Sequence, residues 1–319
     1  MAINTTSTLS ANLPSEYYKK TLLTVMDETL QLVPLGVKTS LPSGSGKVVK
    51  WLVYDKLSAA TGGLSEGVVP SDTSLTTRNV TATVAQYGGY AKISDFLDAT
   101  AIDPVAESAM ERLGKQAALT LDTLTRDVLD AALPNQFANS KANLAATGST
   151  DVLTAKEFLK AVVTLKKNNV GPAQGNNYVS VCHPACIGDV MNDTNIGSWV
   201  DINKYTQSDA NKIFNGEIGK VYMTRILESA NISSTTSGTL SSATVYSNLF
   251  FGEECFGVVS LNGKNIQTFT KPAGSAGSLD PLNQVGTVGW KSLGFVAKYL
   301  APGGSHPDRG LRIRAGSSF

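Results

Sequence analysis

The most restrictive feature of this sequence is a segment that extends further than a folded unit of its length needs. Lys47 to Tyr54 reads as a strand, residues 56–78 as a loop rich in glycine, serine, threonine and proline, and Asn79 to Ser94 as a second strand. A strand of about 15 residues extends about 50 Å. A two-stranded ribbon of that length is not stable alone in water, and the sequence offers no obvious internal partner. The segment therefore predicts a chain that completes its fold by packing against copies of itself.

The residues before the ribbon predict an arm. Residues 1–14 are polar and predict a loose tail, with neither the basic nor the apolar region of a secretory signal. Apolar residues recur every three or four positions over Ser15–Val33, which predicts an amphipathic helix whose apolar stripe needs a surface to cover it. A strand at Val37–Leu41 and a hairpin turn at 42–46 then lead into the ribbon.

A long helix and a polar linker follow the ribbon. Asp103 and Pro104 are a capping residue and a first-turn proline, and apolar residues hold one face of the predicted helix until Pro134. Thirty residues in a helix extend about 45 Å. Residues 135–151 are polar and predict a linker.

The second half of the sequence mixes short helices with strands. Thr154 and Glu157 form a capping box, which predicts a helix with Phe158, Val162 and Leu165 inward and an end at 168–169. A strand at Tyr178–Cys182 and a helix from Pro184 to Met191 come next. The remaining strands are predicted at Val221–Leu227, Val245–Phe251, Gly257–Leu261, Ile266–Thr270 and Thr287–Leu300. The predicted class is α+β, with mostly antiparallel strands.

Composition excludes several roles. The 319 residues carry 27 Lys+Arg against 26 Asp+Glu, a net charge of +1, which argues against a broad basic face for DNA or an anionic membrane. Apolar residues reach 42%, enough for a core, and no apolar run is long enough to span a bilayer. Only 17% of residues are charged, which suits a surface largely covered by other protein.

The sequence contains one metal-like cluster, made of Cys182, His183 and Cys186. A zinc site needs four ligands, and no second pair of ligands is present. Cys182 and His183 are also adjacent on a strand, so they point to opposite sides and make a poor nucleophile pair. We interpret these residues, with the third cysteine Cys255, as buried small side chains, while zinc and nucleophile readings stay open as minor alternatives.

Other possible sites are weaker still. Residues 43–47, SGSGK, resemble a phosphate loop, but a strand follows where a helix would be required. Glu253 and Glu254 would point to opposite faces of a strand, and four aspartates lack the spacing of a calcium loop: Asp189, Asp193, Asp201 and Asp209. A small basic cluster near the C-terminus, Arg309, Arg312 and Arg314, either touches nucleic acid or pairs with acidic neighbours. No catalytic, cofactor-binding or metal-binding residue is predicted, and the chain is not expected to be an enzyme.

Longer motifs carry a family resemblance. The block Lys271–Lys291, KPAGSAGSLDPLNQVGTVGWK, closely resembles a block in the podovirus-type branch of tailed-bacteriophage major capsid proteins. Phe251–Gly257 looks like that family's small-residue turn before a central strand, and 215–222 with 225–229 and the early 9–12 fit the same branch. The order of elements, which is an arm, an extended hairpin, a long helix, an inserted α+β region and returning strands, resembles the Hong Kong-type coat fold across nearly the whole chain.

The resemblance implies a division of the chain into parts. They are an N-terminal arm (1–35), an extended loop (36–95), a peripheral domain with a spine helix (96–150 and 264–319) and an axial domain (151–263). Some relatives join subunits through Lys–Asn cross-links, and Lys47, Lys50 and Lys56 lie in the extended loop. Nothing in the sequence identifies a partner Asn or a catalytic Glu, so no cross-link is expected.

The resemblance also implies a role. We expect a structural major capsid protein, made in the host bacterial cytoplasm, that assembles as hexamers and pentamers into an icosahedral virion shell around double-stranded DNA. The implied partners are copies of the chain, a separate scaffolding protein, a portal, a possible decoration protein and packaged DNA in weak non-specific contact, but no membrane. The alternative within the same fold is a bacterial encapsulating shell that holds protein cargo.

Overall fold

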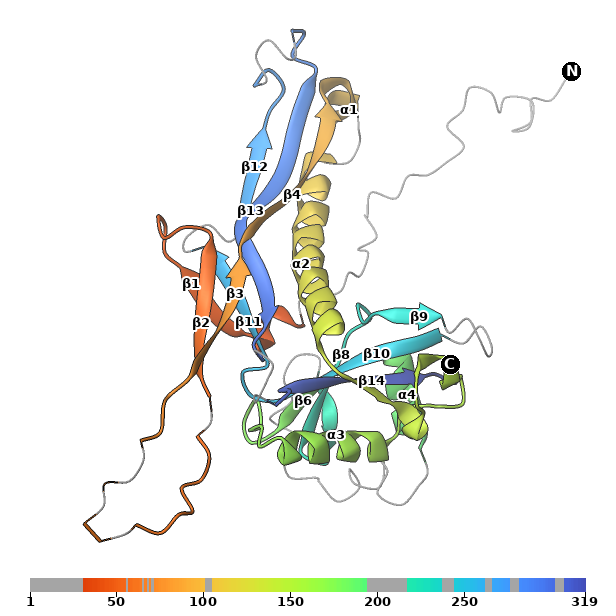
Figure 1. Ribbon diagram of the computed structural model, residues 1–319. Helices are drawn as coiled ribbons and strands as arrows, with labels where there is room; N and C mark the ends of the chain where they lie inside the picture. The colour runs from red at the N-terminus through yellow and green to blue at the C-terminus, as the bar shows by residue number, and fades with distance from the viewer. Residues whose placement is uncertain are drawn as a thin grey trace, which may run out of the picture.

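The computed structural model shows an elongated molecule with a compact body at one end and a long sheet and helix rising from it (Figure 1). It describes residues 31–55, 57–64, 66–67, 69, 72–100, 105–193, 217–236, 244–261, 266–275, 281–301 and 307–319. The helix predicted at Ser15–Val33 therefore lies almost entirely outside the described residues. Its expected end is visible as a single 3₁₀ turn, η1 (Val33–Leu35), before Gly36.

A five-stranded sheet forms the long limb of the molecule. Its central strand is β13 (Val285–Tyr299), the longest strand described. One edge of β13 pairs with β4 (Ala85–Ser94), and the other pairs with β12 (Gln267–Lys271) and then with β11 (Phe256–Leu261). β1 (Val37–Leu41) adds a parallel strand to β11. β13 therefore holds segments that are up to 200 positions apart in the sequence.

The ribbon predicted from the sequence divides into two parts. β2 (Val48–Tyr54) and β3 (Thr77–Thr83) form a two-stranded antiparallel sheet. The predicted second strand is interrupted at Val84, and its remaining part, β4, pairs with β13. The expectation that the whole second strand lacks an internal partner is therefore wrong for its C-terminal half. The partner, β13, is 190 positions away at the register Val285↔Ser94 to Phe295↔Ala85, which local sequence patterns do not reveal. The turn at 42–46 is likewise not a hairpin turn, because β1 and β2 belong to different sheets.

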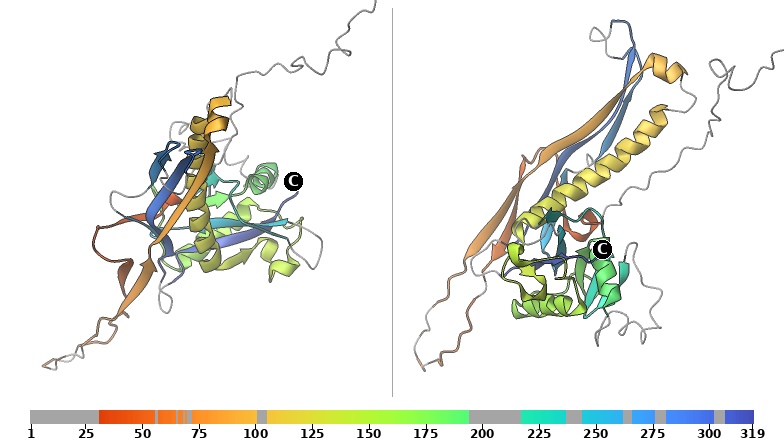
Figure 2. Two further views of the ribbon diagram at one scale, coloured as in Figure 1. Left: turned by 90° about the horizontal axis from the view of Figure 1, so that it is seen from above. Right: turned by 90° about the vertical axis from the view of Figure 1, so that its right-hand side faces the viewer.

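The long predicted helix lies against the five-stranded sheet. α2 (Val105–Ala132) has 28 residues, about 42 Å of helix, and runs beside β4 and β13 (Figure 2). Trp290 of β13 is buried under it and donates from Nε1 to Gln116 Oε1 at 3.2 Å. A short helix, α1 (Asp95–Thr100), joins β4 to the segment before α2 and was not predicted.

The compact body is built on a seven-stranded mixed sheet, in the order β5-β14-β10-β6-β8-β7 with β9 beside β10. Its strands are β5 (Asn135–Phe137), β6 (Tyr178–Cys182), β7 (Glu217–Val221), β8 (Thr224–Glu228), β9 (Ser234–Thr236), β10 (Thr244–Phe251) and β14 (Gly310–Gly316). The predicted linker at 135–151 is not a free connection, because β5 pairs with β14 and two 3₁₀ turns follow, η2 (Ala138–Ser140) and η3 (Leu144–Ala146).

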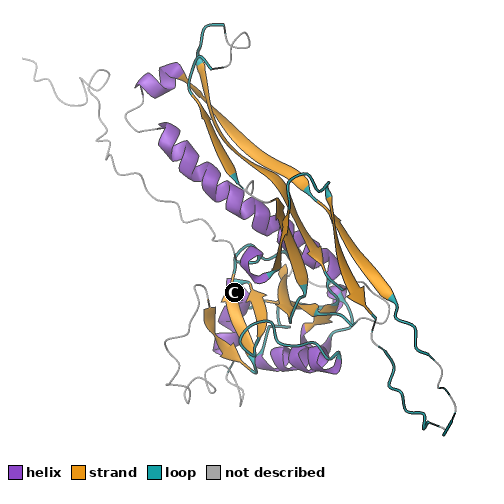
Figure 3. Cartoon of the chain, turned by 90° about the vertical axis from the view of Figure 1, so that its left-hand side faces the viewer, coloured by secondary structure: helices purple, strands orange, loops and turns teal. Residues whose placement is uncertain are grey.

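Two helices cover this sheet and close its core. α3 (Ala155–Lys167) buries Phe158, Val162 and Leu165, as predicted, and α4 (Pro184–Asn192) follows β6 directly. Tyr178 stacks near Phe250 at a centroid distance of 6.0 Å in the same apolar cluster. The body therefore has a hydrophobic core of its own. Figure 3 shows the helices and strands of the body gathered at one end of the molecule.

Two local predictions in the body are wrong. The strand expected at Val221–Leu227 is a hairpin of β7 and β8, turned by Tyr222 and Met223, which both have positive φ. The expected capping box also fails, because Thr154 makes no side-chain cap hydrogen bond. Glu157 is buried and contacts Gln136 and Lys160, so tertiary partners compete successfully with the helix terminus for its carboxylate.

Carboxylates of α2 join the long limb to the body. Asp130 lies 2.9 Å from Arg312 and 3.9 Å from Arg314, both on β14, and accepts a hydrogen bond from Ser247 of β10. About two helical turns before Asp130, Asp122 accepts from the backbone N–H groups of Leu32 (2.8 Å) and Gln31 (3.2 Å). α2 therefore anchors both the start of the described chain and the seven-stranded sheet of the body.

Candidate functional site

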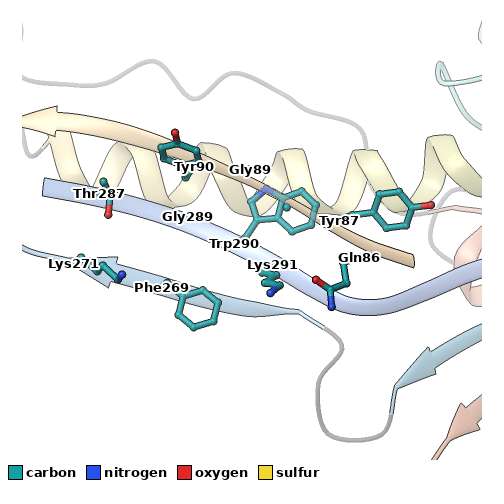
Figure 4. A pocket seen from close by; sticks show the side chains of 11 residues that line it. Gln86, Tyr87, Gly89, Tyr90, Phe269, Lys271, Thr287, Gly289, Trp290 and Lys291 are labelled. Carbon is teal, nitrogen blue, oxygen red and sulfur yellow. The ribbon is translucent and has the colours of Figure 1, made fainter. Parts of the chain in front are cut away.

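One hollow in the described surface lies on the five-stranded sheet, on the face away from α2. Alternation in β4, β13 and β12 sends every second side chain to this face. Tyr90, Gly289 and Phe269 are paired directly across the three strands, so two aromatic rings stand on either side of a glycine (Figure 4). The hollow has a volume of about 570 Å³. We call it the sheet groove; it is lined by residues 86–90, Phe269, Lys271, Thr287 and 289–291.

The floor of the sheet groove requires glycine. A Cβ atom added at Gly289 would lie 2.9 Å from Cβ of Tyr90 and 3.0 Å from the carbonyl oxygen of Gly89. Any side chain there would push Tyr90 away and fill the space between the rings. Gly289 therefore keeps the space between the two rings open.

The sheet groove is both apolar and basic. Tyr90 is 68% exposed and Phe269 47% exposed, which is unusual for aromatic rings on a sheet face. Lys271 and Lys291 line the hollow, and Lys92 pairs with Thr287 one row along. Exposed aromatic side chains surrounded by lysines typically mark a contact surface for another molecule.

A second exposed apolar surface lies on the ribbon. In β2, Trp51 turns toward the five-stranded sheet, where its ring lies against Gly257 of β11 and its Nε1 donates to Thr39 Oγ1 of β1 at 3.3 Å. The opposite face carries Val48, Leu52 and Tyr54, which are 47%, 54% and 59% exposed. We call these three residues the ribbon face. One side of the ribbon is packed on its own chain, and the other is bare.

The loop beyond the ribbon continues this exposed apolar character. In its described part, four apolar side chains are largely in solvent: Leu57, Leu64, Val69 and Leu75. Glu66 and Asp72 are exposed carboxylates in the same loop. The loop, which spans residues 55–76 between β2 and β3, therefore combines apolar and acidic groups.

The cysteine–histidine cluster is structural in its contacts. His183 is the N-cap of α4, its Nδ1 accepts from the N–H of Ala185 at 3.2 Å, and its ring stacks on Tyr246 at 4.0 Å. Burial raises the pKa of the Cys182 and Cys186 thiols to about 12, and it raises that of Cys255 as well. Thiolates are therefore scarce here at neutral pH. Within the described residues, no group of three or more His, Cys, Asp and Glu side chains is arranged to hold a metal ion.

The other candidate residues are used inside the chain. The C-terminal arginines pair with acidic neighbours: Arg309 lies 2.8 Å from Glu254, and Arg312 and Arg314 contact Asp130. Glu253 and Glu254 lie in the turn between β10 and β11, and not on a strand. Asp189 accepts from Ser318, whereas Asp201, Asp209 and Lys56 lie outside the described residues. No described helix is long and apolar enough to cross a membrane.

The long limb of sheet and helix exposes apolar side chains on its sheet face and on the ribbon, as expected for a chain that packs against other protein. A family model for phage capsid protein matches residues 78–305, and the chain belongs to that family. It is a capsid protein, a structural component of the virion. No curated protein sequence matches the chain. The family match does not favour the cargo-holding alternative.

Solved capsids share the fold over nearly their whole length. The chain is similar to the capsid of Ralstonia phage GP4, with a TM-score of 0.71, 13% identity and coverage of 97% of this chain and 96% of that one. It matches the Cyanophage Pam1 capsid with a TM-score of 0.72, 14% identity and coverage of 97% and 98%. For the head of Helicobacter pylori bacteriophage KHP40 the values are 0.70, 9%, 99% and 99%. The predicted Hong Kong-type capsid fold is confirmed.

The sheet groove was not predicted from the sequence. A signal was present, because Gly88, Gly89 and Gly289 interrupt strands that otherwise carry aromatic and charged residues. Glycine in a strand interior often marks a close approach of another group. The signal became interpretable only when the register placed Gly289 between Tyr90 and Phe269.

Proposed function

We propose that the chain is the major capsid subunit of a tailed bacteriophage, and that it assembles as hexamers and pentamers into an icosahedral shell around double-stranded DNA. The observation that carries this proposal is the bare ribbon face, with Val48, Leu52 and Tyr54 exposed on a strand whose other side is packed. A two-stranded sheet that exposes three large apolar side chains on one strand gains stability when a neighbour covers them. The podovirus-type branch remains part of the proposal.

In the proposed shell, the loop of residues 55–76 lies on the sheet groove of a neighbouring copy. Each surface offers what the other lacks: the loop exposes Leu64 and Val69 with Glu66, and the groove exposes Tyr90 and Phe269 with lysines. Apolar burial supplies most of the free energy, and the opposite charges favour the correct register. The contact is heterologous, so rotation about a capsomer axis closes it into a ring.

The division suggested by the sequence fits this role. We propose residues 1–35 as an arm, 36–95 as the extended loop, 96–150 with 264–319 as the peripheral part and 151–263 as the axial part. The segment 264–319 crosses between the sheets, since β13 belongs to one and β14 to the other. A separate scaffolding protein, a portal and a possible decoration protein are the further partners proposed. Packaged DNA is proposed to make weak, non-specific contact, and no catalysis or cross-linking is proposed.

Electron microscopy of the purified full-length chain, alone and with its candidate scaffolding protein, tests the function. Icosahedral shells or hexameric and pentameric rings are expected. A chain that stays monomeric under all assembly conditions, with a protease-resistant ribbon, would contradict the proposal.

A charge-reversal pair tests the loop contact separately. Lys271→Glu with Lys291→Glu is expected to block assembly, and adding Glu66→Lys with Asp72→Lys in the same chain is expected to restore it. Lys298→Glu, on the same strand but outside the groove, is the matched control and is expected to assemble. Normal assembly of the double reversal would remove the groove from the proposed interface.

A further inference from the structure

A second hollow lies on the compact body, between β5 and α3, and it is basic. Its volume is about 530 Å³, and its lining includes Lys141, Lys160 and Lys167 together with the polar side chains of Asn135, Ser140 and Thr164. Lys156 is exposed one turn before Lys160 on the same helix. We call the four lysines, Lys141, Lys156, Lys160 and Lys167, the lysine face.

The helix places three of these lysines in one row. Lys156, Lys160 and Lys167 are separated by four and seven residues, which are spacings that return to the same side of an α-helix. At about 1.5 Å per residue the row is about 16 Å long. Duplex DNA presents a phosphate about every 3.4 Å per strand along its axis, so the row spans about five base pairs.

The carboxylates nearest to the lysine face lie beneath it. Glu157 and Asp151 are each only 3% exposed at the side chain, whereas Lys160 and Lys141 are 33% and 38% exposed. Glu157 also accepts from Gln136 Nε2 at 3.1 Å and from the N–H of Asn139 at 3.3 Å. Lys160 pairs with Glu157 at 2.7 Å and Lys141 lies 3.6 Å from Asp151, so these two lysines are partly neutralised, and the exposed Lys156 and Lys167 carry most of the charge of the face.

The chemistry around the lysines suits phosphate. Ser140, Thr164 and Asn135 are donors that typically contact phosphate oxygens, and Lys160 Nζ is positioned by Ser140 Oγ at 2.9 Å. The one aromatic ring in this lining, that of Phe137, is partly buried, so the lining offers little exposed ring surface on which unpaired bases would stack. The sheet groove, by contrast, combines lysines with exposed rings and suits a protein segment.

We propose that the lysine face binds the phosphate backbone of duplex DNA, and that it is where packaged DNA makes its weak contact with the shell. This inference rests on the proposed function for its biological setting, although the binding chemistry does not. Four lysines give few phosphate contacts on a chain whose net charge is only +1, which agrees with loose holding of the genome. Recognition is independent of sequence, because no described group of the face reads base edges.

The test measures binding of a short fluorescent duplex to the purified full-length chain by anisotropy, between about 50 and 200 mM salt. The double variant Lys156→Gln with Lys167→Gln is expected to lower the slope of log K against log salt by about 2. The matched control, Lys92→Gln with Lys298→Gln, removes the same charge from the five-stranded sheet and is expected to keep the wild-type slope. Both variants should melt at the wild-type temperature, because all four side chains are exposed.

Two results would overturn the inference. One is that the slope of log K against log salt falls equally in both double variants, or does not change in either. The other is equal binding of polyglutamate through Lys156 and Lys167, which would assign the face to an acidic protein. Electron microscopy of the same variants keeps the proposals apart: shells that form with unaltered DNA binding refute only the lysine face, and a wild-type chain that forms no shells refutes the capsid assembly.

Discussion

The compact body and the long limb bury their apolar residues in different ways. In the body, the side chains of Phe158, Tyr178 and Phe250 are at most 2% exposed, and they form one closed cluster. In the limb, Tyr90 and Phe269 stand in solvent on one sheet face, and the ribbon face is bare. The body is closed by its own chain, whereas we propose that a neighbouring copy covers the exposed faces of the limb. Stability and assembly should therefore respond to mutations in different places.

Phe158→Ala in the body should have the largest effect. The ring is fully buried, so its removal leaves a cavity and should lower the free energy of unfolding by about 3–5 kcal/mol. Urea denaturation of the unassembled chain measures this. Leu159→Ala, at the exposed neighbouring position, is the control and should change little. Equal losses would mean that the body is not the self-sufficient region.

Asp130→Ala should have the second-largest effect, because it removes the ion pairs between α2 of the limb and β14 of the body. Arg312 and Arg314 would lose their shared carboxylate, at a cost of about 2 kcal/mol. Burial already lowers the pKa of Arg312, so the uncompensated guanidinium is in an unfavourable place. Thermal melting is expected to separate into two transitions if the limb then unfolds alone. A single transition at the wild-type temperature would contradict the link.

Asp122→Asn should act through pH. Burial raises the pKa of Asp122 above 3.8, so between 3.8 and that raised value the folded chain binds more protons than the unfolded chain. The contribution of this group to stability is therefore present below pH 3.8 and is lost as the pH rises through its folded pKa. The free energy of unfolding of the variant should lack this dependence on pH. At neutral pH its free energy of unfolding should differ from that of wild type by about 1 kcal/mol. Urea denaturation between pH 3 and pH 7 measures this effect, and Asp127→Asn, at an exposed position, is the control. The same pH dependence in wild type and both variants would contradict the prediction.

Leu52→Ser on the ribbon face should have the smallest effect on the isolated chain. The side chain is 54% exposed, so the free energy of unfolding should change by less than about 0.5 kcal/mol. Assembly, followed by light scattering, should nevertheless slow markedly, because each subunit loses an apolar contact with its neighbour. Loss of stability without loss of assembly would reverse the assignment of the two regions.

Local patterns predicted much of this architecture, and pairings over long distances were beyond them. The spine helix, the strand and helix around Cys182 to Met191, and the inward residues of α3 were all recognisable from the periodicity of apolar residues, whereas the predicted cap of the spine helix, Asp103 with Pro104, lies outside the described residues. The partner of β4, the joining of β5 to β14 and the hairpin at Tyr222 depend on contacts or backbone conformations that the sequence encodes only globally. The sheet groove fell in this second group, because its two rings come from strands nearly 180 positions apart.

The central position of β13 has a mechanical consequence. It pairs with β4 along one edge at nine positions between Val285 and Phe295, and with β12 and β11 along the other. Antiparallel hydrogen bonds run perpendicular to the strands, so a pull along the limb loads them in parallel as shear and does not open them one after another. In a wall under outward pressure, a strand in this position distributes a tensile load over its hydrogen bonds to three neighbouring strands, β4, β11 and β12.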